Sequence, residues 1–292
     1  MANLKEIRNR ITSVNSTMQI TSAMKMVSAA KLKRAQDAIT QMRPYAEKLQ
    51  EILSNLSSSL DTSENEYAQE REVKNVLIVG VTSNRGLCGG FNNNITKKIK
   101  TIAASEYKDC NISVLSVGKK MIDAMKYTDW VNTDSELYQS PEEIWNNLTF
   151  NNVSEMAVTL MDAYKAERYD KIVVVYNSFK NAAVQIVQNE QFLPIIAPEE
   201  DSTSNATDYV FDPSKEKIVK DLIPNSLKVQ LYKALLDSHA SEHGARMTAM
   251  HQATDNASDL KKDLQLTYNK ARQAAITNEI LEIVGGAEAL NN

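Results

Sequence analysis

The hydrophobic positions at the start of the chain follow a heptad pattern. No glycine occurs before residue 80, and apolar or small residues alternate at spacings of four and three in one register. These residues are Ile7, Ile11, Val14, Met18 and Thr21, followed by Leu32, Ala35, Ile39, Met42, Ala46, Leu49, Leu53, Leu56 and Leu60. The pattern predicts one long amphipathic helix with a narrow apolar stripe.

Two interruptions of this helix are expected. Lys25 and Ser28 occupy the stripe positions between the two runs. Because Met24 and Val27 are apolar one step earlier, the stripe is expected to swing around the helix there. Pro44 is expected to kink the helix mildly, since proline removes one backbone hydrogen bond.

A second long helix is predicted near the other end of the chain. Between Leu227 and Val284 there is no proline and a single glycine. Small or apolar residues recur there at spacings of three and four, namely Met250, Ala253, Ala257, Leu260, Leu264, Thr267, Ala271, Ala274, Asn278 and Leu281. Pro224 supplies a start and Gly285-Gly286 an end. Two helices of this length cannot fold inside a compact globule, so we expect them to wind around each other.

The middle of the chain alternates between two kinds of segment. β-Branched runs cover 75–83, 111–117, 171–179 and 183–193, and helical stretches lie near 92–106, 118–126 and 141–166. Strands that alternate with helices predict a mainly parallel sheet. The expected fold is therefore α/β, an antiparallel coiled coil of long N- and C-terminal helices plus a Rossmann-like α/β middle domain. The expected boundaries are an N-terminal shaft helix (1–60), a linker (61–74), a head domain (75–198), a linker loop (199–214) and a C-terminal shaft helix (215–292).

Charge and cysteine content narrow the class of protein. The formal net charge of −4 argues against a general nucleic-acid binder. Residues 1–48 nevertheless contain nine Lys and Arg against three acids, which favours an acidic partner or an anionic surface. Two cysteines form neither a disulfide framework nor a metal motif. We expect no signal peptide, no transit peptide and no insertion into a membrane, because no apolar stretch approaches about 20 residues.

The glycine-rich turn from Gly80 to Gly90 is the main candidate for chemistry, because a phosphate-binding loop would stand between a first strand and its helix. Its glycines do not follow G-x-G-x-x-G, and no Lys-Ser/Thr pair of a P-loop follows. A structural or partner-contact turn is therefore favoured over nucleotide binding. Cys88, close to Arg85, is favoured as a small residue of the turn over a reactive thiol.

Other catalytic or metal sites find little support. His239, His243 and His251 have helical spacings of four and eight, but His251 lies too far along to share an ion with His243. These histidines are expected to face solvent or an interface. No G-x-S-x-G elbow is present, so we expect no catalytic triad, no cofactor and no metal. Near the end, Ile276, Ile280, Ile283 and Val284 form an apolar tip, which requires a socket.

Several blocks along the chain resemble the gamma-subunit family of bacterial F-type ATP synthases. They are Ile20–Lys31, Arg43-Pro-Tyr-Ala46, Thr82–Gly90, Ala245–Met250, Ala253–Asn256 and Tyr268–Thr277. The resemblance implies a non-catalytic central-stalk rotor that couples proton translocation to ATP synthesis or hydrolysis and regulates both. The implied partners are the alpha and beta subunits, whose ring the paired helices thread, and the epsilon subunit and membrane c-ring, on which the head rests. The implied location is the cytoplasmic side of the bacterial plasma (inner) membrane, as a peripheral subunit.

The same resemblance assigns partner contacts to seven residues. Met24, Arg246, Gln273 and Thr277 match positions where the shaft meets the beta subunits and their catch region. Arg85 and Cys88 match a head turn near the lower beta lobes and epsilon, and Tyr209 matches a region that touches the c-ring. The long cysteine-containing insertion of chloroplast gamma subunits is absent, so thiol control of that kind is not expected.

Two other readings of the sequence remain open at this point. A Rossmann-type enzyme with helical arms would bind a nucleotide at the turn from Gly80 to Gly90. A coiled-coil adaptor would have the same paired helices without a stoichiometric ring partner. The apolar tip argues mildly against the adaptor, because tethers usually end in polar caps.

Overall fold

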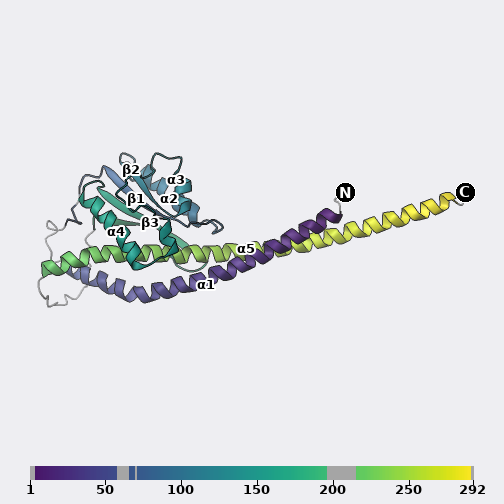
Figure 1. Ribbon diagram of the computed structural model, residues 1–292, viewed down its shortest axis with the longest axis horizontal. Coiled ribbons are helices and arrows are strands. Elements are labelled where there is room, and N and C mark those ends of the chain that lie inside the picture. The colour runs from purple at the N-terminus through teal and green to yellow at the C-terminus, as the bar shows by residue number, and fades with distance from the viewer. Residues whose placement is uncertain (1–3, 58–65, 70, 196–214, 291–292) are drawn as a thin grey trace. The chain divides into compact units, whose positions relative to one another are not determined.

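The computed structural model describes the chain except for residues 1–3, 58–65, 70, 196–214 and 291–292 (Figure 1). The chain divides into two compact units, one formed by residues 1–28 and 247–292 and the other by residues 29–246. Two long helices, α1 (Leu4–Ser57) and α5 (Lys215–Leu290), contribute residues to both units. No helix among the described residues is both long and apolar enough to cross a bilayer.

The larger unit contains the predicted alternation of strands and helices. In chain order its elements are β1 (Asn75–Val81), α2 (Phe91–Ser105), β2 (Asn111–Val117), α3 (Lys119–Met125), the 3-10 helix η2 (Glu143–Asn146), α4 (Phe150–Lys165), β3 (Lys171–Phe179) and β4 (Gln185–Leu193). The strand order is β2-β1-β3-β4, with β1 parallel to both neighbours and β4 antiparallel to β3. The prediction of a mainly parallel sheet is confirmed.

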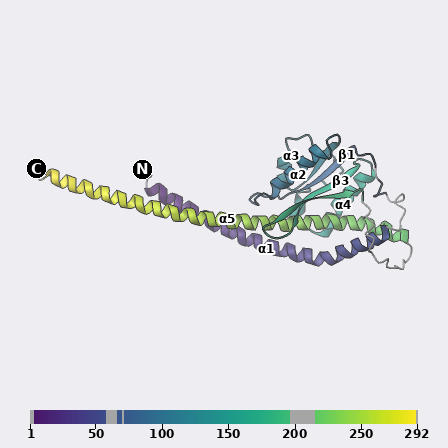
Figure 2. The same ribbon diagram turned by 180° about the vertical axis from the view of Figure 1, so that it is seen from behind.

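Both faces of this sheet are covered, which explains the nearly continuous apolar sequence of β1. Val76 and Ile78 pack against α2 and α3, whereas Leu77 and Val79 pack against α4 and the 227–235 segment of α5. Figures 1 and 2 show α2 and α3 on the side of the sheet opposite α5. The first part of α5 is therefore part of the core of the head.

Gly118 lies where the ends of β1 and β2 approach most closely. Its φ angle is +102°, and a Cβ atom built there would lie 2.2 Å from the carbonyl oxygen of Thr82. The backbone N–H of Thr82 donates to the carbonyl of Val117 over 2.8 Å, so the two strand ends are fixed together. Only glycine fits both the backbone conformation and the contact.

The smaller unit is an antiparallel pair of helices. Arg8 Nη2 donates to Tyr268 Oη over 2.8 Å, and Lys261 Nζ donates to Asn15 Oδ1 over 2.8 Å. Residues early in α1 thus meet residues late in α5, which confirms the predicted antiparallel coiled coil. Ile7 is buried and Ile11, Val14 and Met18 are half-buried, so the predicted register of α1 is confirmed as well.

The stripe of α1 does not swing around the helix between the two runs, so that prediction is wrong. Ser28 stays in the seam at 3% exposure, whereas Val27 is 58% exposed. Ser28 can be buried because its Oγ donates to the carbonyl of Met24 over 2.8 Å, which satisfies the hydroxyl within the helix. Pro44 lies inside α1, as expected.

The predicted seam of α5 is wrong at Leu260, Thr267, Ala274, Asn278 and Leu281, which are exposed, whereas Ala253 is half-buried. Met250, Ala257 and Leu264 are buried, but Leu260 is 47% exposed. The intervening seam positions are Thr254, Lys261 and Tyr268, each of which bonds to α1, as in the 2.8 Å contact between the hydroxyls of Thr254 and Thr21. Polar residues that find partners across a helix pair are invisible to a search for apolar periodicity.

The start predicted at Pro224 and the end predicted at Gly285-Gly286 are also wrong. The structure places Pro224 inside α5, and the helix continues past Gly285-Gly286 to Leu290. An internal proline costs about 3 kcal/mol, which the packing of Leu227 and Leu231 into the head core offsets. Glycine within a helix costs only about 1 kcal/mol relative to alanine.

The two predicted linkers have different outcomes. In the first, Tyr67 packs against the head core, and its carbonyl accepts the N–H of Ile195 over 2.9 Å, so this segment belongs partly to the head. The second, 199–214, lies outside the described residues, together with Tyr209.

Candidate functional site

The turn between β1 and α2 is held by its own side chains. Ser83 donates two hydrogen bonds within the turn, from its N–H to Asn92 Oδ1 over 3.0 Å and from its Oγ to the carbonyl of Arg85 over 2.6 Å. Asn84 Nδ2 donates to the carbonyl of Glu142 over 2.9 Å, which ties the turn to the segment before η2. The turn is thus anchored at both sides of its tip.

Cys88 points into the turn and is 2% exposed. Asn92 Nδ2 donates to its Sγ over 3.2 Å. Burial raises the pKa of the Cys88 thiol, and the hydrogen bond with Ser83 opposes that rise only in part. The prediction that Cys88 is a small residue of the turn is confirmed, because the side chain lies inside the turn.

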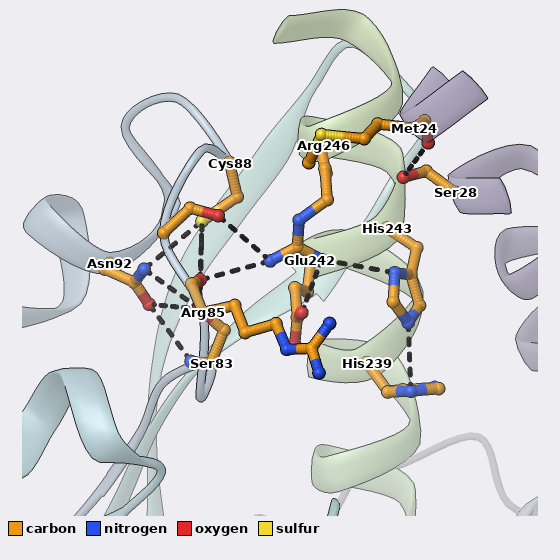
Figure 3. A network of polar contacts seen from close by, with 11 residues as sticks. Met24, Ser28, Ser83, Arg85, Cys88, Asn92, His239, Glu242, His243 and Arg246 are labelled. Atoms are coloured by element: carbon orange, nitrogen blue, oxygen red, sulfur yellow. Dashed lines mark hydrogen bonds and ion pairs between the residues drawn. The ribbon is translucent and has the colours of Figure 1, made fainter. Parts of the chain in front are cut away.

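The interior of the turn is occupied. The side chains of Ser83, Cys88 and Asn92 bond to one another there (Figure 3). A phosphate-binding loop instead directs free backbone N–H groups at its ligand. The geometry therefore favours a structural turn over a nucleotide cradle.

The α5 helix is fixed to the sheet directly below this turn. Ser241 Oγ donates to the carbonyl of Asn177 over 3.0 Å, and Asn177 Nδ2 donates to the carbonyl of Phe91 over 3.2 Å. Gly244 permits a close approach, because a Cβ there would lie 3.2 Å from the Cα of Ala182. Strand β3, the start of α2 and α5 are therefore joined through buried polar contacts.

Arg246 connects α5 to the turn. Its guanidinium is almost fully buried, with Nη1 donating to Glu242 Oε1 over 2.5 Å. Nη2 donates to the carbonyl of Arg85 over 3.1 Å and to that of Gly86 over 3.3 Å (Figure 3). Burial raises the pKa of Glu242, and the positive charge of Arg246 opposes that rise. The fork of one guanidinium thus holds two consecutive backbone carbonyls and one carboxylate.

A histidine pair extends the network along α5. Arg246 Nη1 lies 3.3 Å from His243 Nδ1, and His243 Nε2 lies 3.1 Å from His239 Nε2. A guanidinium has no acceptor, so His243 Nδ1 accepts, and a neutral His243 then carries its proton on Nε2 and donates it to His239. The ring of His239 stacks on Trp145, with centroids 5.7 Å apart.

Both histidines are neutral at ordinary pH. Burial lowers the pKa of His239 to about 4, and the nearby charges of Lys31 and Arg246 add to that effect. Burial, the neighbouring His239 and Arg246 lower the pKa of His243 to about 3. The histidines were expected to face solvent or an interface. His251 is exposed. His243 is buried, with partners for its ring nitrogens within the helix, so it does not face solvent, and its place at an interface stays a prediction.

The structure brings together three of the seven predicted contact residues. Arg85, Cys88 and Arg246 lie in one cluster of the larger unit, where Arg85 is exposed and the other two are buried. Met24 is half-buried, and Gln273 and Thr277 are exposed, all in the smaller unit. Contact of these residues with partner subunits stays a prediction.

Sequence reasoning missed several members of the cluster. The four-residue spacing between Glu242 and Arg246 is the usual spacing of a helical ion pair and could have indicated their contact. Asn92 and Leu87 carry no such signal, because their roles depend on the path of the turn. Among the described residues no group of side chains could hold a metal ion.

Comparison with known proteins identifies the family. A family model described as ATP synthase matches residues 3–290. The ATP synthase gamma chain of Christiangramia forsetii is 62% identical over 293 residues, which span all of both chains, and that of Flavobacterium psychrophilum is 60% identical over 99% of both.

Solved structures share the fold. A chain of the Euglena gracilis mitochondrial ATP synthase, from a structure of OSCP, F1 and the c-ring, has a TM-score of 0.66 at 22% identity, covering 98% of this chain and 94% of that one. A chain from the central stalk and c-ring of the Tetrahymena thermophila mitochondrial enzyme has a TM-score of 0.56 at 24% identity, covering 80% and 99%. With the sequence matches over its whole length, the chain belongs to the ATP synthase gamma-chain family.

Proposed function

We propose that this chain is the central-stalk rotor of an F-type ATP synthase. In this role it couples proton translocation through the membrane sector to ATP synthesis or hydrolysis in a ring of alpha and beta subunits. The observation that carries the proposal is the full-length match to proteins named ATP synthase gamma chain. Further proposed partners are the epsilon subunit and the c-ring.

The smaller unit has the properties that such a role requires. The α5 helix carries Ile276, Ile280, Ile283 and Val284, each about half exposed or more. These residues do not continue the seam of the coil, whose last buried residue on α5 is Leu264 and whose last half-buried one is Ala271 among the described residues. An apolar segment of this kind is stabilised by an apolar sleeve, which offers few directional bonds and so permits turning with low barriers.

Coupling depends on unequal contacts. A ligand or subunit shifts a conformational equilibrium only by its difference in affinity for the two states. A two-helix coil is not symmetric about its axis, and its α1 part is rich in Lys and Arg. It therefore contacts three surrounding catalytic subunits differently, and turning it passes those differences around the ring.

Catalysis in this proposal belongs to the other subunits. The thiol of Cys88 is buried and its pKa is raised, and the imidazoles of His239 and His243 bond to each other. These groups are thus committed to internal contacts. As a peripheral subunit, the chain is assigned to the cytoplasmic side of the bacterial inner membrane.

Contacts with partners are proposed for Met24, Gln273 and Thr277 in the coil, for Arg85 in the head, and for Tyr209, which lies outside the described residues. For Arg246 and Cys88 the buried positions favour a supporting role, in which they hold the turn that presents Arg85. A partner contact through the turn would then depend on both residues without touching them.

Purification of the tagged chain from its native membranes in mild detergent tests this function. Mass spectrometry is expected to give one copy per three alpha and three beta subunits. Ile280→Asp, which places a charge on the apolar tip, is expected to reduce recovery of the ring, and Glu279→Gln beside it serves as the control. Recovery of the free chain, or of a different set of partners, would overturn the proposal.

A further inference from the structure

A cavity of about 380 Å³ lies between α1, the end of β3 and α5. All the residues that line it belong to the larger unit. Its volume is within the range of small-molecule sites, which is about 300–1,000 Å³. The lining shares no residue with the turn between β1 and α2, so the cavity is a separate feature of the unit.

Positive charge reaches this cavity from two different elements. Lys33 and Arg43 come from α1, and Lys180 directly follows β3. Two acidic side chains, those of Asp37 and Asp237, line the cavity as well. Three cations against two carboxylates leave an excess of one positive charge.

Both carboxylates already have partners. Asp37 forms an ion pair of 2.9 Å with Lys33, one helical turn earlier on α1. Asp237 accepts a hydrogen bond of 3.4 Å from the Oγ of Ser178. Burial raises the pKa of Asp237, and the positive charge of Lys233 on the same helix opposes that rise. The negative charge in the cavity is therefore largely compensated without Arg43 or Lys180.

Arg43 and Lys180 are the two cations that remain. Both are exposed, and among the described residues neither has a carboxylate within ion-pair distance. The charge of Arg43 acts on Asp237 from beyond that distance. Two cations without an ion pair, carried by separate elements, thus border one cavity.

This arrangement fits a doubly charged anion. A carboxylate carries a single negative charge, whereas a phosphate group carries about −1.5 to −2 at pH 7 and offers three acceptor oxygens. A guanidinium binds phosphate through paired N–H donors and an ammonium binds it as a point charge. The side-chain amide of Gln36, which also lines the cavity, supplies further donors.

One part of the lining is apolar. Phe179 and Ile39 are both half-buried and both line the cavity. Apolar walls with a few convergent polar groups are typical of sites for small organic molecules. The cavity thus has room for a phosphate group and for the molecule that carries it.

We propose that this cavity binds a soluble small molecule that carries a phosphate group, with the phosphate between Arg43 and Lys180 and the rest of the molecule against Phe179. Such a ligand joins α1 to the head. The inference goes beyond the proposed function and does not depend on it, because every residue of the site belongs to this chain.

Calorimetric titration of the full chain tests the site, with inorganic phosphate and ADP as separate probes. One molecule is expected to bind per chain. Arg43→Gln and Lys180→Gln are each expected to weaken binding about tenfold, because each removes a charge-assisted hydrogen bond. Arg34→Gln and Lys97→Gln remove exposed cations outside the lining. As controls they should change the affinity by less than about twofold, because salt screens distant charges.

Asp237→Asn provides a change of the opposite sign. It removes a negative charge next to the phosphate, so it is expected to tighten binding of both probes about twofold or more. A general loss of folding cannot imitate a gain in affinity. Weaker binding in this variant, or equal losses in the lining and control variants, would contradict the proposal.

Amide hydrogen exchange with and without ADP locates the ligand. Slower exchange is expected at residues 33–43 and 178–181. Slower exchange at residues 82–90 instead would place the ligand at the glycine-rich turn and overturn the proposal. The same conclusion would follow from an absence of saturable binding at millimolar concentrations of both probes, or from binding only to vesicles that contain phosphatidylglycerol.

Discussion

The guanidinium of Arg246 donates a hydrogen bond of 3.1 Å to the backbone carbonyl of Arg85, which lies 161 positions earlier in the chain. The side chain of Arg246 thereby fixes the turn between β1 and α2 to helix α5. Arg246 was expected from the sequence to meet a partner subunit, but its hydrogen bonds go to this chain. Its contribution to coupling would therefore act through the position of the turn.

Arg246→Lys tests the fork geometry. A single ammonium keeps the charge but cannot reach two carbonyls and Glu242 in one plane. We expect faster amide hydrogen exchange at residues 84–87 and a loss of about 1–3 kcal/mol of stability. Arg272→Lys, an exposed position on the same helix, is the control and should change neither quantity. Unchanged exchange at 84–87 in Arg246→Lys would mean that the turn holds itself.

Glu242 and Arg246 should be strongly coupled. Removing one partner of a buried pair leaves an uncompensated charge and costs about 3–5 kcal/mol. Glu242→Gln with Arg246→Met in one chain is expected to lose much less than the sum of the two single changes. A double-mutant cycle by denaturant unfolding measures the difference, and additive losses would show that the pair contributes little.

The histidine pair predicts a loss of stability in acid. In the folded chain the pKa values of His239 and His243 are lowered to about 4 and about 3, below their ordinary value of 6.5. The unfolded chain therefore takes up protons first as the pH falls below 6.5, and the folded state loses about 1.4 kcal/mol per histidine and pH unit until about pH 4. The charged groups that act on the pair are Arg246 and Lys31.

Unfolding free energies between pH 7 and pH 5 check this prediction. The chain with His239→Gln and His243→Gln is expected to show a flatter decline than the unmodified chain, because glutamine does not titrate. His251→Gln, on an exposed histidine, should leave the slope unchanged. Equal slopes in all three chains would contradict the burial of neutral histidines.

The seam of the coil predicts unequal effects at two leucines. Leu264 is 9% exposed and Leu260 is 47% exposed, although both stand in the apolar spacing of the sequence. Leu264→Ala is expected to cost about 2–5 kcal/mol, as is usual for a buried leucine. Leu260→Ala should cost about 0.5 kcal/mol or less in the isolated chain. Equal losses in thermal unfolding would favour the seam predicted from the sequence.

Gly118→Ala is predicted to disrupt the head. A methyl group would meet the carbonyl oxygen of Thr82 at 2.2 Å, and alanine does not tolerate a φ of +102°. We expect a loss of several kcal/mol, which is at the upper end for a point substitution. Gly285→Ala is the control, since open space surrounds that position within the helix, and it should stabilise the chain slightly. Circular dichroism during heating distinguishes the two outcomes.

Patterns that repeat along the chain predicted most of the fold. Strands 111–117 and 171–179 were correct at both ends, because runs rich in β-branched residues leave a clear signal. The helix start predicted at Pro224 was wrong, because packing of Leu227 and Leu231 into the head core overrides the usual meaning of this proline. A helix-breaking residue such as Pro224 is a local signal, and it carries no information about tertiary packing that stabilises the helix around it.

The candidate site was predicted only in part. The resemblance to a family identified Arg85, Cys88 and Arg246 as site residues. It did not predict whether their side chains are buried or exposed. Whether a side chain of a turn points inward, as that of Cys88 does, or outward, as that of Leu87 does, depends on φ angles that glycine content alone does not fix. The buried histidine pair was missed for a similar reason, since its hydrogen bonds, rather than its composition, allow burial.

Rotation of the head relative to an immobilised ring tests the central claim most directly. The complex is fixed to a surface through its beta subunits, and a gold particle is attached at Cys substituted for Tyr127, an exposed position of the head. Addition of ATP is expected to turn the particle in one direction with three pauses per revolution. A particle that stays fixed while the same complexes hydrolyse ATP would show that this chain is not the rotor.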